Sequence, residues 1–429
     1  MEEVSLREHH PHRRRIGGRG YFHRVGPGLI TGAADDDPSG IGTYSQVGAA
    51  FGFSLLWSTF AALPLAVSVQ EATARLGLFS GKGLAALIRE QFPKWVLYVA
   101  LVLVVGANSF NIGADLGSMA AATRLLVPIP QLILVIAFGI GMAVMEIVIP
   151  YHRYSKVLRW LCVSLLSYIA VLFIVDVAWS NVWGGVFTPD VSFNKTTIAA
   201  LIALFGTTIS PYLFFWQTSE EVEELKDGGE ANGTTGDGGS HLRAMRGDVV
   251  AGMSSGVLVM FAIMVTSAAT LGDAGITTVA SAEQAAMALE PLAGSAAKYL
   301  FALGIVGTGL LAVPVLAGST SYALAETFGW REGLSLKMSQ ARAFYMVIVA
   351  SMCVGMAMNV AGLDPLRALY WSAMLNGLAA PPLIAMIWVL ARRKSVLGEH
   401  ASGRVSSTLV GLAAVLSAAL PVLYFVANK

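Results

Sequence analysis

Long runs of apolar residues recur along most of the chain, and short polar segments separate them. Runs such as 96–106, 131–150 and 257–271 contain almost no ionisable side chain. Runs that approach the ~20 residues needed to cross a bilayer predict membrane-spanning helices. The pattern predicts eleven spans, at residues 26–51, 53–76, 95–124, 130–150, 156–178, 197–218, 248–271, 292–325, 340–361, 365–391 and 405–427.

The composition agrees with a membrane protein. Hydrophobic residues make up 55% of the chain and charged residues only 13%, whereas a soluble protein carries about a quarter charged residues. The chain therefore has too little polar surface to coat a water-soluble body, and its expected surroundings are a lipid bilayer. A net charge of +1 argues against a nucleic-acid partner, which would require a basic face. The oligomeric state is left open, and a monomer is compatible with the sequence.

The positive charges predict the orientation of the spans. With eleven spans, 23 of the 28 Lys and Arg residues fall on the side of the N-terminus, as the positive-inside rule expects of cytoplasmic segments. Residues 1–25 then form a basic cytoplasmic tail, because no cleavage site follows a short apolar core. The Gly-rich segment 219–247 is expected to be a flexible cytoplasmic loop. We expect a bacterial inner-membrane protein with the C-terminus outside.

The first span contains three consecutive carboxylates, Asp35, Asp36 and Asp37, about eleven residues from its start. At 1.5 Å per residue this places them ~16 Å deep, near the middle of a ~30 Å hydrocarbon core. An ionised carboxylate there costs at least ~2.5–3.5 kcal/mol, so it must face a polar cavity or a cation. Pro38 disfavours helix at the preceding residue, which predicts unwinding over residues 37–40. Carbonyl groups freed by the break would need a partner, such as a cation.

The sixth span contains a similar interruption. Residues 206–211 read Gly-Thr-Thr-Ile-Ser-Pro in the middle of an apolar run. A single proline often only kinks a membrane helix, but paired breaks at corresponding positions are typical of an inverted-repeat transporter with a site at the midplane. The predicted fold is therefore an all-α polytopic membrane protein. Its first repeat covers 26–178, its second covers 179–391, and a loop with an eleventh span follows at 392–429.

Several motifs resemble the Nramp (natural resistance-associated macrophage protein) divalent metal transporters. The motifs are Gly26-Pro27-Gly28-Leu29, Asp37-Pro38-Ser39-Gly40, Phe51-Gly52-Phe53-Ser54-Leu55-Leu56-Trp57, Gln70-Glu71-Ala72-Thr73-Ala74-Arg75-Leu76-Gly77 and Ser80-Gly81-Lys82-Gly83-Leu84. The resemblance implies the LeuT fold, with two inverted five-helix repeats and an eleventh helix. It also implies that the metal is cargo and not a cofactor, and that the protein is not an enzyme.

The resemblance implies a metal site between spans one and six, with departures from the usual family pattern. Asp37 is retained, but Gly40 stands where the family has a ligand Asn. Ser210 stands where the family usually has a Met, and Thr207 corresponds to the small residue that offers its carbonyl. Asp36 is a further candidate for contact with a hydrated ion; the alternative is that it lines the cytoplasmic vestibule.

The resemblance also implies positions for a proton path. Family histidines implicated in proton transfer fall on Tyr212 and Gln217. On span three an aspartate is retained as Asp115, but the acidic residue one turn later is Ser118. Asp115 belongs to a polar stripe that could be either a water path or interhelical glue, and Asn376 on span ten is a candidate to complete the site.

These departures predict the preferred cargo. A thioether favours Mn²⁺ and Fe²⁺, whereas hydroxyl, carboxylate and carbonyl oxygens favour harder ions. Mg²⁺ keeps several waters, so a roomier oxygen-lined site suits it, and the pattern is similar to the Nramp-related magnesium transporters. Loss of histidine removes groups that titrate near neutral pH. We therefore expect weak or no proton coupling, with the membrane potential contributing ~4.6 kcal/mol per 100 mV for a divalent ion.

Three alternatives remain at this stage. One is a proton-coupled Mn²⁺ or Fe²⁺ transporter, and another is a LeuT-fold carrier of a small organic solute, although three aspartates disfavour an anionic one. A membrane enzyme that holds Mg²⁺ against a pyrophosphate would need its acidic motif at the membrane surface. Away from the site, Glu71 and Arg75 are four residues apart and predict a structural ion pair.

Overall fold

The structure is a computed structural model that describes residues 27–149, 163–189, 192, 194–227 and 238–426. Within these ranges every regular element is a helix. The predicted tail 1–25 lies outside the described residues.

The first half of the chain contributes a broken helix and three long unbroken ones. Its elements are α1 (Pro27–Asp35), α2 (Pro38–Phe51), α3 (Trp57–Ser80), α4 (Leu84–Gln91), α5 (Lys94–Arg124), α6 (Gln131–Val148), η2 (Val163–Leu165), α8 (Leu166–Val171) and α9 (Trp179–Phe187).

The described part of the second half also begins with a broken helix, continues with four long helices and ends with a further long helix. Its elements are α10 (Lys195–Thr208), α11 (Pro211–Asp227), α12 (Gly238–Ser267), η3 (Ala268–Gly272), α13 (Ala282–Met287), α14 (Glu290–Ala293), η4 (Gly294–Ala296), α15 (Ala297–Phe328), α16 (Arg342–Val360), α17 (Pro365–Arg392), α18 (Lys394–Leu397), η5 (Gly398–His400) and α19 (Arg404–Val426).

Eight helices among the described residues are long and apolar enough to cross a membrane. They correspond to the predicted spans three, four and six to eleven. The predicted first span is divided into α1 and α2, and the predicted second span is α3, whose lower part is polar. Residues 156–162 of the predicted fifth span lie outside the described residues, and the described part of it includes the short helix α8.

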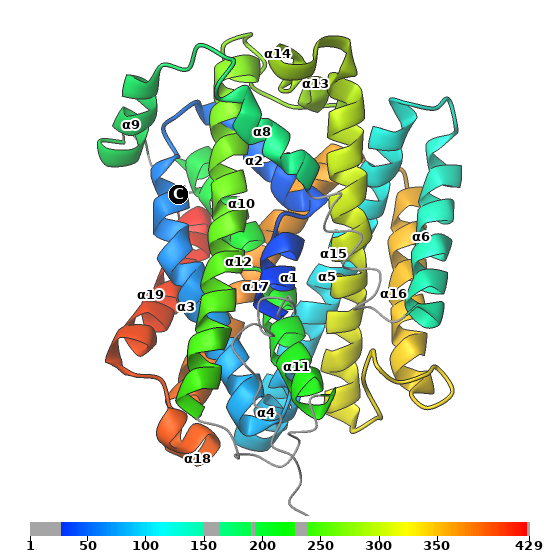
Figure 1. Ribbon diagram of the computed structural model, residues 1–429, viewed down its shortest axis with the longest axis vertical. Coiled ribbons are helices and arrows are strands. Elements are labelled where there is room, and N and C mark those ends of the chain that lie inside the picture. The colour runs from blue at the N-terminus through cyan, green and yellow to red at the C-terminus, as the bar shows by residue number, and fades with distance from the viewer. Residues whose placement is uncertain (1–26, 150–162, 190–191, 193, 228–237, 427–429) are drawn as a thin grey trace, which may run out of the picture.

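The two broken helices lie at the centre of the molecule (Figure 1). Helix α1 has α2 above it, α11 below it and the long α12 beside it, to its left in this view. Helices α13 and α14 lie at the upper end of this view, and α4 and α18 lie at the lower end. Helix α19 covers one side of the bundle, and α6 and α16 cover the other.

Helices α1 and α12 approach so closely that only glycine fits between them. A Cβ added to Gly32 would lie 2.2 Å from the carbonyl carbon of Gly252, and one added to Gly252 would lie 2.2 Å from the Gly28 oxygen. Small residues allow membrane helices to pack backbone against backbone. The contact is reinforced by Asp248 of α12, whose Oδ2 accepts the Gly28 N–H at 2.6 Å.

Charged side chains join two helices at the lower end. Glu71 accepts from Arg75 one turn later and from Nε of Arg246 at 2.7 Å. The predicted ion pair between Glu71 and Arg75 within α3 is therefore confirmed, and the contact between Glu71 and Arg246 joins α3 to α12.

The prediction of a flexible loop over 219–247 is wrong in its extent. Helix α11 continues to Asp227 and α12 already begins at Gly238. The acidic run stays helical because its side chains are held by neighbours: Glu221 accepts from Gln217 Nε2 at 2.8 Å, and Glu223 accepts from the Tyr322 hydroxyl.

Candidate metal site

The break in the first span is short and lies at Asp36 and Asp37. Helix α1 ends at Asp35 and α2 begins at Pro38. Asp37 is the N-cap residue of α2. The Asp37 Oδ1 atom accepts from the Gly40 N–H at 2.7 Å and from the Ser39 hydroxyl at 2.6 Å. The predicted unwinding over 37–40 is wrong in its extent, because proline suits the first position of a helix and an N-cap aspartate restarts the helix at once.

The second oxygen of Asp37 is held by α5. Asn111 Nδ2 donates to Asp37 Oδ2 at 3.0 Å, and the Ser372 hydroxyl of α17 donates to Asn111 Oδ1. The carboxylate is thus oriented by a hydrogen-bond chain from two other helices. Asn376, which the sequence predicts at this site, is buried, and neither polar atom of its side chain has a partner among the described residues.

The break in the sixth span faces the first. Helix α10 ends at Thr208 and α11 begins at Pro211. The Ser210 hydroxyl donates to the carbonyl oxygens of Thr207 and Gly206, at 2.6 and 2.9 Å. The Ser210 oxygen keeps its lone pairs in this arrangement, because it acts only as a donor in both contacts.

The two breaks meet beside Gly40. The hydroxyl oxygens of Ser39 and Thr207 lie 3.4 Å apart. A Cβ added to Gly40 would lie 3.2 Å from the Tyr44 ring, 3.3 Å from the Asp35 carbonyl oxygen and 3.4 Å from Thr207 Oγ1. The position predicted to have lost an asparagine ligand is therefore bordered by the Tyr44 ring and by one oxygen atom from each broken helix.

Tyr212 and Gln217 join α11 to α1. The Tyr212 hydroxyl donates to the Ala34 carbonyl at 2.8 Å, which satisfies one of the carbonyls left open where α1 ends. The Gln217 Oε1 atom accepts from the Thr31 hydroxyl at 2.5 Å. Both residues of the predicted proton path thus hold the two helices together on the lower side of Asp37.

Asp115 lies on α5, one turn after Asn111, and is fully buried. It is close enough to interact electrostatically with Asp37, and the Ser39 backbone N–H at the start of α2 lies close to its carboxylate. The Ser118 hydroxyl donates to the Asp115 carbonyl at 2.8 Å. Asn108, on the same stripe, instead binds Thr320 Oγ1 of α15 at 3.0 Å, so this part of the stripe connects helices.

Asp35 and Asp36 point away from the Asp37 side of the break. A Cβ added to Gly256 of α12 would lie 3.5 Å from Asp35 Oδ2 and 3.7 Å from Asp36 Oδ2. Consecutive aspartates therefore face different helices, α12 for the first two and α5 for the third. Among the described residues no group of three or more His, Cys, Asp and Glu side chains is arranged to hold a metal, so a cation beside Asp37 would depend on carbonyl and hydroxyl oxygens.

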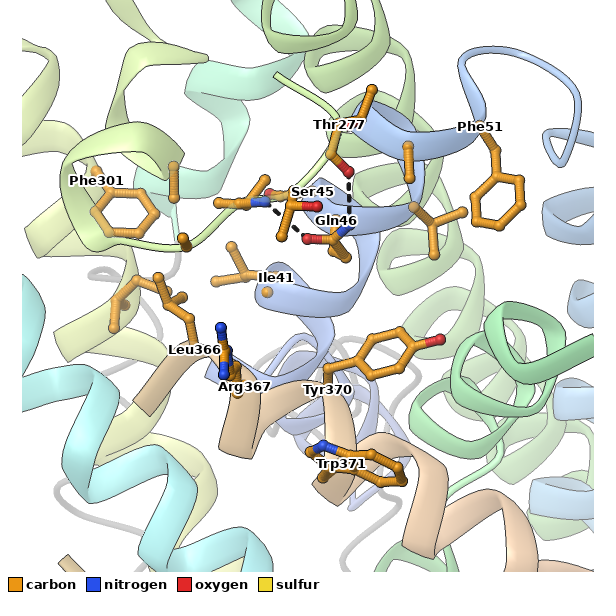
Figure 2. A pocket seen from close by; sticks show the side chains of 18 of the residues that line it. Ile41, Ser45, Gln46, Phe51, Thr277, Phe301, Leu366, Arg367, Tyr370 and Trp371 are labelled. Atoms are coloured by element: carbon orange, nitrogen blue, oxygen red, sulfur yellow. Dashed lines mark hydrogen bonds between the residues drawn. The ribbon is translucent and has the colours of Figure 1, made fainter. Parts of the chain in front are cut away.

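A cavity of about 340 Å³ lies in the upper half of the molecule, between α2 and α17 (Figure 2). Ile41, one turn after Asp37, lines the cavity, as do Leu366 and Tyr370 of α17. Gln46 of α2 donates to the Thr277 carbonyl at 3.0 Å and so fixes the segment that covers this side. One wall of the cavity therefore lies one helical turn from the break in the first span.

Comparison with known proteins shows the family. The family model described as "Natural resistance-associated macrophage protein-like" (Nramp) matches residues 28–427. The chain belongs to the Nramp family. Proteins of this family are transporters and not enzymes, and the metal they carry is cargo and not a cofactor. The predictions that this protein is not an enzyme and that its metal is cargo are thereby confirmed.

Curated relatives of this Nramp protein cover most of its length. The "Divalent metal cation transporter MntH" of Yersinia pestis (strain Pestoides F) is 26% identical over 397 residues, which cover 90% of each chain. The MntH of Pectobacterium carotovorum subsp. carotovorum (strain PC1) is 30% identical over 309 residues, covering 68% of this chain and 70% of its own.

Solved structures show the fold. The manganese transporter of Eremococcus coleocola, in complex with an aromatic bis-isothiourea substituted compound, aligns with a TM-score of 0.72 at 18% identity, covering 97% of this chain and 88% of its own. MhsT in complex with L-phenylalanine aligns with a TM-score of 0.65 at 13% identity, covering 94% and 98%. The predicted LeuT-type fold of a multi-pass membrane protein is thereby confirmed, with α19 as the helix beyond the two repeats.

Sequence reasoning did not assign the partner of Asp37 in this Nramp protein. Asn111 lies in the predicted third span and Ser372 in the predicted tenth, but nothing in the sequence connects either to a carboxylate on another helix. The available signal was that both are polar residues at mid-span depth, facing the same interior as Asp37.

Proposed function

We propose that this Nramp protein carries a divalent metal cation across the bacterial inner membrane, at a site between the two broken helices. The observation that supports this most strongly is the Asp37 carboxylate, which lies buried at one break while Ser39 and Thr207 bring the second break to it. The names of the MntH relatives as divalent metal cation transporters agree with this cargo.

The proposed ligands are all oxygen atoms. Asp37 supplies a carboxylate, Thr207 a backbone carbonyl and Ser210 its hydroxyl oxygen, and the Asp35 carbonyl borders the Gly40 position. Asp36 supplies a second negative charge on the other side of the break. Hard cations prefer oxygen ligands, and Mg²⁺ retains waters when few protein ligands are supplied. We therefore propose partly hydrated Mg²⁺ as the preferred cargo.

One observation favours Mn²⁺ as the alternative cargo. The Thr208 hydroxyl lies 3.5 Å from the Met260 sulfur of α12, so a thioether lies close to the end of α10 although none stands at Ser210. A sulfur ligand would favour Mn²⁺ or Fe²⁺. The structure of a relative described as a manganese transporter shares the fold.

Transport is proposed to have weak or no coupling to protons. Tyr212 and Gln217 occupy the positions of the family histidines, and each is engaged in a hydrogen bond to α1. Neither side chain changes charge near neutral pH. The membrane potential would then drive import, with the N-terminus in the cytoplasm and the C-terminus outside.

Flux into proteoliposomes tests this proposal. Uptake of Mg²⁺, Mn²⁺ and Ca²⁺ is measured with a pH-sensitive dye inside the vesicles, on the unmodified protein and on Asp37→Ala. The matched control is Asp364→Ala, because Asp364 caps α17 before Pro365 as Asp37 caps α2 before Pro38. We expect metal flux to fall more than tenfold in Asp37→Ala and to stay unchanged in Asp364→Ala. We also expect that metal uptake by the unmodified protein does not acidify the vesicle interior. Equal flux in Asp37→Ala, or proton movement with the metal, would contradict the proposal.

A further inference from the structure

A second cavity, of about 400 Å³, lies at the lower end of the molecule, where α11 ends and α15 connects to α16. The cavity beside α2 is lined mostly by apolar residues, whereas this one is lined mostly by polar and charged side chains. The residues that line it are Lys226, Trp330, Arg331, Glu332, Leu336 and Gln340. None of them belongs to the proposed metal site.

Two positive charges meet in this cavity without a close partner. The Lys226 and Arg331 side chains are exposed, and neither head group makes a hydrogen bond or a close ion pair with a described residue. Lys and Arg both bind phosphate groups, and the planar guanidinium of Arg donates two parallel hydrogen bonds to phosphate oxygens. Gln340 adds a further donor, because its Oε1 atom already accepts the Lys337 N–H at 3.0 Å and its amide N–H groups are left to donate.

The carboxylates next to the cavity are engaged with other donors. Glu223 accepts the Leu334 N–H at 2.8 Å, and Glu326 accepts the Ser219 hydroxyl at 2.8 Å. These carboxylates therefore hold neighbouring segments and do not pair with the two cations of the cavity.

Glu332 lines the cavity itself. Burial raises the pKa of Glu332 from 4.5 to about 8; the charges of Glu326 and Glu223 add to the shift, and Lys226 and Arg89 oppose it. Near neutral pH this carboxyl group is therefore mostly protonated. In that form it does not cancel a positive charge, and it can donate a hydrogen bond to an anionic oxygen.

Aromatic side chains place the cavity at the depth of lipid headgroups. Helix α15 ends at Phe328, and the exposed rings of Phe328 and Trp330 stack with their centroids 5.1 Å apart. Exposed tryptophan is typical of the membrane–water interface. Because Trp330 also lines the cavity, the positive charges beside it lie where basic pockets at the ends of membrane helices bind anionic headgroups.

We propose that Lys226, Arg331 and Gln340 bind a phosphate group in this cavity, supplied by the headgroup of an anionic phospholipid or by a free phosphate. The bound group joins the end of α11, the second half of the broken sixth span, to the connection between α15 and α16. The site is separate from Asp37, so this inference does not depend on the proposed cargo.

Titration calorimetry on the purified full-length protein in a neutral detergent tests the proposal. The probes are inorganic phosphate and a short-chain phosphatidylglycerol, each titrated into the unmodified protein and into Lys226→Gln/Arg331→Gln. Both substitutions are at exposed positions, so that they remove charge without disturbing the packing. The control is Lys337→Gln, which removes an exposed positive charge from the same connection but outside the cavity.

We expect the unmodified protein and Lys337→Gln to bind a probe with the same Kd, and the Kd to rise about tenfold or more in the double variant. Binding of phosphatidylglycerol alone would identify a phospholipid as the source, and binding of inorganic phosphate alone a free phosphate. Competition between the two would show that the phosphate group itself is recognised.

Three results would overturn the phosphate site. The first is that neither probe binds to the unmodified protein. The second is that the double variant binds as tightly as the unmodified protein. The third is that Lys337→Gln weakens binding as much as the double variant does, because the attraction would then come from the general positive charge of this end.

Discussion

Asn111 Nδ2 donates a hydrogen bond of 3.0 Å to Asp37 Oδ2, across residues that are 74 positions apart in the chain. Through this bond α5 holds the carboxylate at the first break, while the N-terminus of α2 binds its other oxygen. The start of its own helix and a side chain of α5 therefore position the Asp37 carboxylate before any cation binds.

Removal of the Asn111 side chain is expected to weaken metal binding. A hydrogen bond to a charged group is worth about 1.5–3 kcal/mol, so Asn111→Ala should raise the apparent Kd or KM for the metal about 10- to 100-fold. Binding is measured by calorimetry and flux in proteoliposomes. Asn108→Ala is the control, because Asn108 lies on the same helix but binds Thr320 of α15; an equal loss in both variants would show that the effect is structural.

A methionine at position 210 is expected to change the order of cation preference. Ser210→Met replaces a hard hydroxyl with a soft thioether at the end of α10, which favours Mn²⁺ over Mg²⁺. Competition between the two ions in a flux assay should shift toward Mn²⁺ about tenfold or more, that is by ~1.4 kcal/mol. If the ion ranking did not change, Ser210 would not be a ligand.

Asp248 is expected to hold α1 in place at the lower side. Its carboxylate accepts the N–H groups of Gly28 and Leu29, at 2.6 and 3.3 Å, and such contacts at a helix start contribute about 0.5–2 kcal/mol. Asp248→Ala should therefore increase amide hydrogen exchange over α1. Asp273→Ala, an exposed change beyond the other end of α12, should not; unchanged exchange in Asp248→Ala would contradict this role.

The stability of the lower end is expected to fall as the pH rises. Burial, followed by the nearby Glu326 carboxylate, raises the pKa of Glu332 from 4.5 to about 8, and Lys226 and Arg89 oppose the shift. Between these values the folded state binds more protons than the unfolded state, so the free energy of unfolding decreases as the pH rises through that window.

Thermal unfolding in detergent at pH 5 and pH 8 tests this. The Tm should fall on going to pH 8, and Glu332→Gln should reduce that fall by about 2–4 °C. Glu283→Gln is the control, since Glu283 is exposed on α13 at the other end of the molecule. A pH dependence that is the same in both variants would remove Glu332 as its source.

The breaks could be predicted from the sequence, because Pro38 and Pro211 act locally on their own helices. The extent of the first break could not, since it depends on Asp37 serving as an N-cap that restarts the helix at Pro38. The direction of each aspartate depends on tertiary contacts: Asn111 and Gly256 come from other helices, and no local pattern connects them to residues 35–37.

The most direct test of the account is a structure of the protein crystallised with Mn²⁺ and measured at the manganese absorption edge. We predict an anomalous peak at coordination distance from an Asp37 carboxylate oxygen and from an oxygen of Thr207 or Ser210. A structure in which manganese bound elsewhere and left the Asp37 carboxylate without a metal contact would contradict it.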